Sequence, residues 1–199
     1  MNNIFKQIPE FNSLLKEYRQ EKRGLFKKKY RLKQLTKKYR FLENITSKEI
    51  DDIELENEIL KLFKIIGYKT HKPINKRDVD CIIYLNNCVL GIEVKNSNYP
   101  TENELFQALK YCNRNRTDNF EMFPIVVWNN AKTNQAFDQF RIKDAVINNF
   151  GIITTKELVK GFLKFKQEKI TKDEFEFIIT RTGLIKYSNK SINESGKGR

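Results

Sequence analysis

The segment from residue 80 to residue 95 constrains the fold of this chain more than any other. Residues 80–85 (DCIIYL) and 88–95 (CVLGIEVK) are apolar and rich in β-branched side chains, which is typical of buried strands. Asn86 and Asn87 lie between them and fit a two-residue hairpin turn. The sequence therefore predicts two paired strands joined by a tight turn.

The second of these strands carries charge on one face only. Alternate side chains of a strand point to opposite sides of the sheet. Leu90, Ile92 and Val94 therefore face one way, and Glu93 and Lys95 face the other. We expect a carboxylate and an ammonium group to leave the same face of an otherwise apolar strand.

Asp80 begins the partner strand, so the hairpin can bring it near Glu93. Two converging carboxylates make a hard oxygen site suited to Mg²⁺ or Mn²⁺, and the backbone carbonyl of Val94 can complete it. Such a metal polarises a phosphate oxygen and lowers the pKa of a bound water, which Lys95 would orient or assist. The alternative is a Glu and a Lys on the wet face of a strand, but the apolar surroundings favour a site.

The segments around the hairpin alternate between helix and strand. We expect a helix at 46–66, capped by Thr46 or Ser47 and ended by Gly67, and a helix over 101–113. The second begins with a capping box, Thr101 to Glu104. The remaining predicted elements are a strand at 124–128, a continuous or broken helix at 134–149, a short strand or an extended connection at 151–154, a helix at 156–166 capped by Thr155, and a helix at 171–181. This order predicts an α/β fold with a small mixed sheet flanked by helices.

Asp80 followed by Glu93-Val94-Lys95 resembles the signature of the PD-(D/E)xK nuclease superfamily, which has the restriction-endonuclease-like fold. The preceding segment, residues 55–68 (LENEILKLFKIIGY), is similar to the first core helix of the Mrr-like and Holliday-junction-resolvase-like branches. In those branches a Glu early in the helix joins the metal site. The resemblance assigns that role to Glu56, with Glu58 as the alternative.

The helix after the second strand carries Gln107 and Tyr111, which match the QxxxY motif of RecB-like nucleases. Residues four apart share one helix face, so the pair could reach the phosphate or hold Lys95 and the metal-bound water. The alternative is a core Tyr111 with a polar neighbour. The resemblance covers about residues 50–130.

The first motif departs from the family pattern at one position. Val79 stands where the superfamily has proline. Asp78 is a rival for Asp80, and we prefer Asp80 because it adjoins the strand.

The chain is basic, with a formal net charge of +13, and the charge is uneven. Residues 1–50 carry 14 Lys or Arg against 5 Glu, whereas the middle of the chain is nearly neutral. A basic protein attracts polyanions, chiefly DNA or RNA, with a membrane surface as the competing partner. A loop directly before Asp80 would suit a DNA backbone and contains Lys69, Lys72, Lys76 and Arg77.

Residues 9–43 read as helix. Apolar side chains fall every seven residues, at Phe11, Tyr18, Leu25, Leu32 and Tyr39. This spacing predicts a coiled coil or an antiparallel helical pair, with a break at Gly24. Two interpretations stay open: a helix with a solvated basic face packed against the main domain, or a basic arm along a nucleic-acid backbone, with a possible homodimer seam.

Several function classes have no support in the sequence. Three cysteines without a CxxC pair argue against disulfides and zinc, and no phosphate-binding glycine loop is present. A Ser/His/Asp triad has no support either, because it would have to use His71, the only histidine. The absence of a signal peptide or an apolar membrane segment predicts a cytoplasmic protein that does not enter a membrane.

These observations predict a basic helical arm at 1–45, a restriction-endonuclease-like domain at 46–187 and a disordered tail at 188–199. The expected activity is Mg²⁺-dependent hydrolysis of phosphodiester bonds in DNA, with RNA not excluded, in restriction, phage defence, recombination or repair. The alternative is a nuclease fold used for nucleic-acid or protein binding with little or no catalysis.

Overall fold

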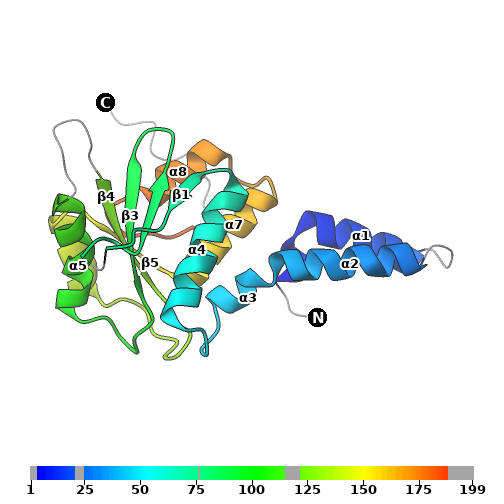
Figure 1. Ribbon diagram of the computed structural model, residues 1–199, viewed down its shortest axis with the longest axis horizontal. Helices are drawn as coiled ribbons and strands as arrows, with labels where there is room; N and C mark the ends of the chain where they lie inside the picture. The colour runs from blue at the N-terminus through cyan, green and yellow to red at the C-terminus, as the bar shows by residue number, and fades with distance from the viewer. Residues whose placement is uncertain (1–3, 21–24, 76, 115–121, 188–199) are drawn as a thin grey trace.

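A mixed β-sheet organises the chain in the computed structural model, which describes residues 4–20, 25–75, 77–114 and 122–187 (Figure 1). Its six strands follow one another in sequence order across the sheet. The first three pair antiparallel, and β3 to β6 pair parallel. The strands are β1 (Lys69–His71), β2 (Cys81–Tyr84), β3 (Val89–Lys95), β4 (Met122–Trp128), β5 (Gly151–Thr154) and β6 (Gly183–Leu184). The predicted mixed sheet is confirmed.

The hairpin between β2 and β3 forms as predicted. Leu85 N–H donates to the carbonyl of Cys88 at 2.9 Å, which closes a turn around Asn86 and Asn87. The register pairs Cys81 with Ile92 at the far end of the hairpin. Asp80 therefore enters the sheet beside the charged end of β3.

Helices cover both faces of the sheet. They are η1 (Phe5–Gln7), α1 (Pro9–Gln20), α2 (Leu25–Tyr39), α3 (Phe41–Ile45), α4 (Asp52–Ile66), α5 (Glu102–Arg114), α6 (Gln139–Ile147), α7 (Thr155–Lys166) and α8 (Lys172–Ile179). Strand β4 shows the two layers in its alternation. Ile125 and Val127 join the core beneath α4 and α7, whereas Val126 and Trp128 join the core beneath α5 and α6.

Helices α1 and α2 form an antiparallel pair that projects from the sheet domain (Figure 1). The hydroxyl of Tyr39 donates to Glu10 Oε2 at 2.8 Å and ties the end of α2 to the start of α1. At the base of the pair, Phe41 packs edge-on against Phe162 of α7, with ring centroids 5.9 Å apart. Of the two arrangements that the seven-residue spacing predicted, the structure contains the antiparallel helical pair. The break expected at Gly24 and the predicted tail lie outside the described residues.

Two short strands were not predicted. Residues 69–71 were expected to be loop, yet they form β1, in which Thr70 pairs with Ile83. Residues 183 and 184 form β6 beside β5. Both lie at the edges of the sheet. There the segment becomes extended because it pairs with the open N–H and C=O groups of the neighbouring strand, and its own side chains matter less.

Three helix boundaries were wrong. Helix α4 is capped by Asp51, which accepts from Glu54 N–H at 2.8 Å, whereas Thr46 donates to the carbonyl of Leu42 in α3 and Ser47 accepts from Glu49 N–H before the helix begins. Helix α7 is capped by Thr154 rather than Thr155. The helix expected from residue 134 begins only after Asp138, which caps α6.

The other fold-level expectations involve cysteines and membrane spans. Cys81, Cys88 and Cys112 are free thiols, and two of them are buried. Within the described ranges, no helix combines the length and apolarity that crossing a membrane requires. Gly67 ends α4 in the left-handed conformation, with φ of 103°, as the sequence predicted.

The Asp51 cap gives a stability test. Replacing Asp51 with Ala removes the acceptor for Glu54 N–H and should lower the free energy of unfolding by about 1 kcal/mol. Asp51→Asn keeps an acceptor and should cost much less. Urea unfolding followed by circular dichroism measures both variants, and equal midpoints for Asp51→Ala and the unmodified protein would contradict the assignment of this cap.

Candidate active site

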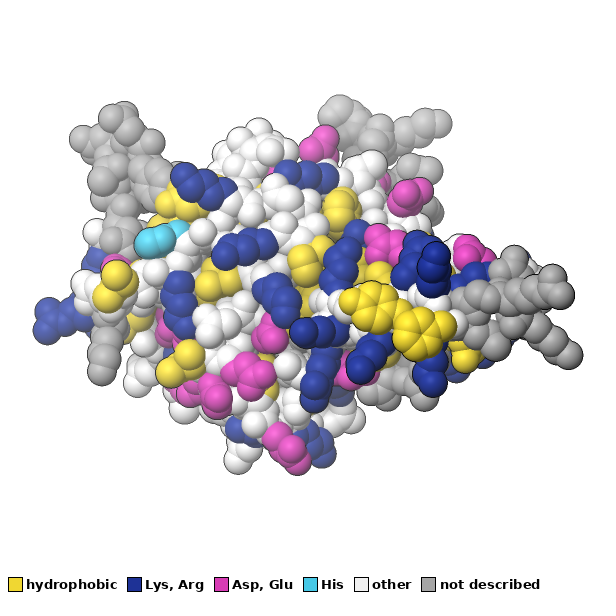
Figure 2. All heavy atoms as spheres, turned by 45° about the vertical axis from the view of Figure 1, so that its right-hand side comes forward, with side chains coloured by type: hydrophobic (Ala, Val, Ile, Leu, Met, Phe, Trp, Pro, Cys, Tyr) yellow, Lys and Arg dark blue, Asp and Glu magenta, His cyan; other side chains and the backbone are white. Residues whose placement is uncertain are grey.

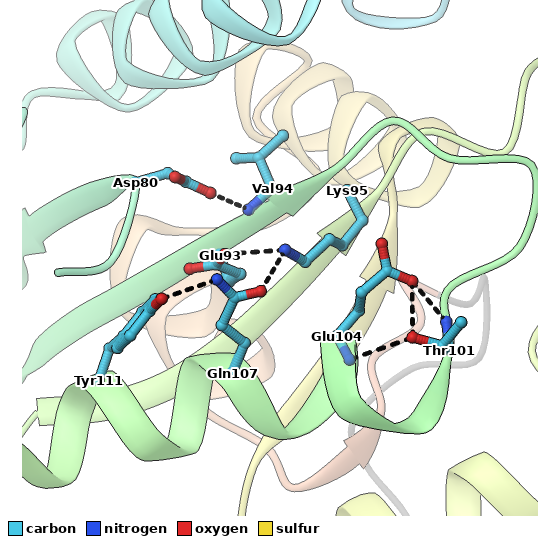
Figure 3. Close-up of polar contacts among 8 residues, drawn as sticks. All are labelled: Asp80, Glu93, Val94, Lys95, Thr101, Glu104, Gln107 and Tyr111. Carbon is cyan, nitrogen blue, oxygen red and sulfur yellow. Dashed lines mark hydrogen bonds and ion pairs between the residues drawn. The ribbon is translucent and has the colours of Figure 1, made fainter. Parts of the chain in front are cut away.

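The candidate site lies at the carboxyl end of β3, between the sheet and α5. Glu93 and Lys95 point from β3 toward α5, while Val94 points to the other side (Figure 3). Leu90 and Ile92 are fully buried in the core on the Val94 side. The predicted division of this strand into an apolar face and a charged face is confirmed.

Asp80, the residue directly before β2, reaches the same strand. Its Oδ2 accepts from the backbone N–H of Val94 at 2.7 Å, one step beyond the last hairpin pair (Figure 3). Burial raises the pKa of the Asp80 carboxyl, and the charge of Glu56 adds to this, although the Val94 hydrogen bond opposes it. The expected approach of Asp80 to β3 is confirmed.

Glu93 is the buried acid of the site, with only 2% of its surface exposed. Its Oε1 accepts from Lys95 Nζ at 2.8 Å, whereas its Oε2 is buried and has no hydrogen-bond partner among the described residues. Burial and then the charge of Asp80 raise the pKa of Glu93 to about 7, against the opposing effect of Lys95. This carboxyl therefore exchanges its proton near neutral pH.

Lys95 is held from two sides. Its Nζ donates to Glu93 Oε1 and to Gln107 Oε1, each at 2.8 Å (Figure 3). Gln107 Nε2 in turn donates to the hydroxyl of Tyr111 at 2.9 Å. The QxxxY pair thus acts as one unit on α5 that fixes the direction of the Lys95 ammonium group. Gln107 contacts Lys95 directly, and Tyr111 acts through Gln107.

Two local features set the position of α5. The predicted capping box is present: Thr101 N–H donates to Glu104 Oε2 at 2.7 Å, and Glu104 N–H donates to Thr101 Oγ1 at 3.3 Å (Figure 3). Further along, α5 lies so close to β3 that a Cβ at Gly91 would collide with the sulfur of Cys112. The helix therefore starts at a fixed residue and sits at a short distance that only glycine permits.

Helix α4 brings Glu56 toward the site from the opposite face of the sheet. The charge of Glu56 raises the pKa of both Asp80 and Glu93. Glu56 Oε2 is paired with Lys72 Nζ at 2.8 Å. Its alternative, Glu58, is paired with Lys61 at 3.2 Å and is not among the groups that shift either pKa. These charge effects favour Glu56 over Glu58, and its role as a metal ligand stays a prediction.

The basic residues before Asp80 have different surroundings. Lys72 is occupied by Glu56 and also donates to Asn57 Oδ1 at 3.1 Å. Lys69 places its Nζ over the ring of Tyr84, 5.4 Å from the centroid, and Arg77 is exposed. Lys76 lies outside the described residues. Contact of these four residues with nucleic acid stays a prediction.

Sequence reasoning missed a buried asparagine that ties the strand ends together. Asn129 is fully buried directly after β4, and its N–H donates to the carbonyl of Lys95 at 2.8 Å. Its Nδ2 donates to the carbonyl of Ser47 and to Asn96 Oδ1, each at 2.9 Å. Asn129 thus joins the end of β3 to the segment before α4. The available signal was a polar Asn-Asn pair directly after an apolar strand.

The donor set is suited to proton transfer and to binding a hard cation. Asp80 and Glu93 supply carboxylate oxygen atoms, and Lys95 supplies a fixed positive charge, while a contribution from the Val94 carbonyl stays a prediction. Within the described ranges, no three His, Cys, Asp or Glu side chains are gathered closely enough to hold a metal by themselves. Any cation here would therefore draw on backbone, water or substrate oxygens as well as the two central carboxylates.

Comparison with known proteins supports the fold. No protein-family model and no curated protein matches the chain. A solved structure of the restriction endonuclease FokI bound to DNA aligns with a TM-score of 0.57 and 16% identity, over 75% of this chain and 30% of that one. A second structure of the same endonuclease aligns with a TM-score of 0.55 and 16% identity, over 73% of this chain and 30% of the other. The chain therefore spans less than a third of the length of these neighbours, and its fold is restriction-endonuclease-like, as the sequence predicted.

Proposed function

We propose that the protein is a metal-dependent endonuclease that hydrolyses phosphodiester bonds in DNA. The observation that carries the proposal is the arrangement of Asp80, Glu93 and Lys95 at one strand end, with Lys95 fixed by Gln107. The restriction-endonuclease-like fold supports it, because the two similar structures belong to an endonuclease and one of them is bound to DNA. The branch of the superfamily and the biological setting stay predictions.

The residues at the site fit a divalent metal. Glu93 Oε2 is buried without a partner among the described residues, and burial raises the pKa of both Asp80 and Glu93 despite the nearby charge of Lys95. Mg²⁺ prefers such oxygen ligands, and Mn²⁺ substitutes for it. Asp80, Glu93 and the Val94 carbonyl would hold the ion, with Glu56 in support. When bound, it would polarise a phosphate oxygen and lower the pKa of a coordinated water.

The other residues of the site have roles that do not depend on the ion. The ammonium group of Lys95 would lie against the attacking water and the negative charge that develops on the phosphate. Gln107 would keep that ammonium group in place, and Tyr111 would fix the orientation of the Gln107 amide. Lys69, Lys72, Lys76 and Arg77 would contact the DNA backbone. Lys72 would first have to leave Glu56.

A second function is favoured by one observation. The second function is nucleic-acid or protein binding by a nuclease fold with little or no catalysis. The described residues contain no cluster of three metal-binding side chains, as expected of such a binding protein. In that case Lys72 would be a permanent partner of Glu56 and would neutralise it. The two functions differ in whether Mg²⁺ binds and whether strands are cut.

The first test is plasmid nicking in Mg²⁺. Glu93→Gln and Lys95→Gln should each lower the rate by about 100-fold or more, because each removes a group that acts on the reacting phosphate or water. Glu102→Gln and Lys110→Gln make the same chemical changes at exposed positions of α5 and serve as matched controls. Equal nicking by all four variants would refute the assignment of the site.

The second test uses stability and pH without a metal. The pKa of the Glu93 carboxyl is about 7 in the folded protein against an ordinary value of 4.5, so the folded state holds the extra proton between these values. Stability should therefore fall as pH rises through this window, by about 3 kcal/mol in total. Glu93→Gln removes the loss and should be more stable than the unmodified protein at pH 8, with the gain fading toward pH 4.5.

Thermal unfolding in EDTA and in Mg²⁺ measures both effects. Mg²⁺ should raise the melting temperature of the unmodified protein at pH 8 and leave that of Glu93→Gln nearly unchanged, since a ligand stabilises only the state that binds it. An equal response of both proteins to Mg²⁺ would place the ion elsewhere. A pH-independent difference between them would contradict the raised pKa of Glu93.

A further inference from the structure

The outer face of α2 combines aromatic and cationic side chains in a way that packing does not explain. This face, which we call the aromatic-cationic face, consists of Phe26, Lys29, Tyr30, Lys33 and Lys37, all of them exposed. With about 3.6 residues per turn, these positions lie on one side of the helix. The packed side is the opposite one, where Leu32 and Tyr39 are buried. The face is therefore unused by the fold.

The two rings are unusually exposed for their type. Phe26 has 85% of its surface exposed and Tyr30 has 58%. The two rings lie one helical turn apart, on the side of α2 away from the core. Exposed large apolar side chains that gather in one place indicate a binding surface. Figure 2 shows apolar side chains at this end of the molecule surrounded by Lys and Arg.

The charge of α2 selects the class of partner. Its 15 residues, LFKKKYRLKQLTKKY, include seven Lys or Arg and no acidic residue. A partner that covers this helix must be anionic and must offer flat apolar groups to two rings. A nucleic-acid strand meets both needs, because its phosphates pair with Lys and its bases stack on aromatic side chains.

The spacing of the rings favours unpaired bases over a duplex. Residues four apart on a helix differ by about 6 Å along its axis, whereas bases in B-DNA follow one another every ~3.4 Å and their faces are hidden by stacking. Bases of a single strand can separate and lie against each ring. A membrane surface fits less well, since an interfacial helix needs a broad apolar face, and here the remaining apolar side chains, such as Leu32 and Tyr39, are buried in the core.

We propose that the aromatic-cationic face of α2 is a binding site for single-stranded nucleic acid, in which Phe26 and Tyr30 stack on bases and Lys29, Lys33 and Lys37 contact phosphates. The binding stands on this face alone. Its use in bringing a substrate with unpaired nucleotides to Asp80 and Glu93 rests on the proposed nuclease function.

The test is fluorescence anisotropy of the full chain with labelled oligothymidine in EDTA, so that no cleavage occurs. Phe26→Ala/Tyr30→Ala should weaken binding by about tenfold or more. Lys29→Gln/Lys33→Gln/Lys37→Gln should reduce the slope of log affinity against log salt by about 2. The matched control is Phe140→Ala/Phe177→Ala, which removes two rings that are 64% and 56% exposed on other helices, and it should bind like the unmodified protein.

Three outcomes would overturn the proposal. The first is a loss of affinity in the control as large as that in Phe26→Ala/Tyr30→Ala. The second is equal or tighter binding of a hairpin duplex of the same length, with the same loss on removing Phe26 and Tyr30. The third is unchanged oligothymidine binding by Phe26→Ala/Tyr30→Ala together with loss of self-association in sedimentation, or of binding to phosphatidylserine vesicles, which would assign the face to a second copy or to a membrane.

The two proposals fail separately. Oligothymidine binding in EDTA is measured without cleavage, and Mg²⁺-dependent nicking is measured separately. Normal binding with no Mg²⁺-dependent nicking would refute the nuclease and keep the binding site on α2. Normal nicking with no effect of Phe26→Ala/Tyr30→Ala on binding would refute the binding site on α2 and keep the nuclease.

Discussion

The buried carboxylate of Glu93 is the constraint to which the surrounding structure responds. A charged group in an apolar interior is destabilising unless it is paired and hydrogen-bonded. Lys95 pairs with one oxygen, and Gln107 of α5 holds Lys95 in line. The other oxygen is buried without a partner among the described residues. A fold selected for stability alone would place an apolar residue here, so the buried oxygen without a partner is the observation on which the proposed metal site rests.

The topology explains why this site lies where it does. Strand β3 is the boundary between the antiparallel and parallel parts of the sheet, so a hairpin strand carrying Asp80 flanks it on one side and β4 on the other. Ligands in α/β proteins bind beyond the carboxyl ends of strands, and β3 and β4 end together here. Asn129 joins these two ends to the segment before α4. The segment that leads into α4 is thereby held beside the end of β3.

The sequence predicted the features that local pattern determines. The faces of β3, the turn at Asn86-Asn87 and the capping box at Thr101 each depend on residues within a few positions, and all are present. Strand β1 was missed because its pairing partner, and not its own polar side chains, makes it a strand. Asn129 was missed for a related reason: its partners are more than 30 residues away, and only the folded sheet brings them together.

The sequence left two interpretations of the basic N-terminal helices: packing against the main domain, or an arm that binds nucleic acid. In the structure, one face of α2 is packed and the opposite face is exposed. The seven-residue spacing of Leu32 and Tyr39 belongs to the side of α2 that packs inward, where Tyr39 bonds to Glu10 of α1. Phe26 and Tyr30 fall outside that spacing and face outward. Packing therefore accounts for one side of the helix and leaves the other exposed. Since α3 joins α2 to α4, which carries Glu56, the chain connects this outward face to the candidate active site through a single short helix.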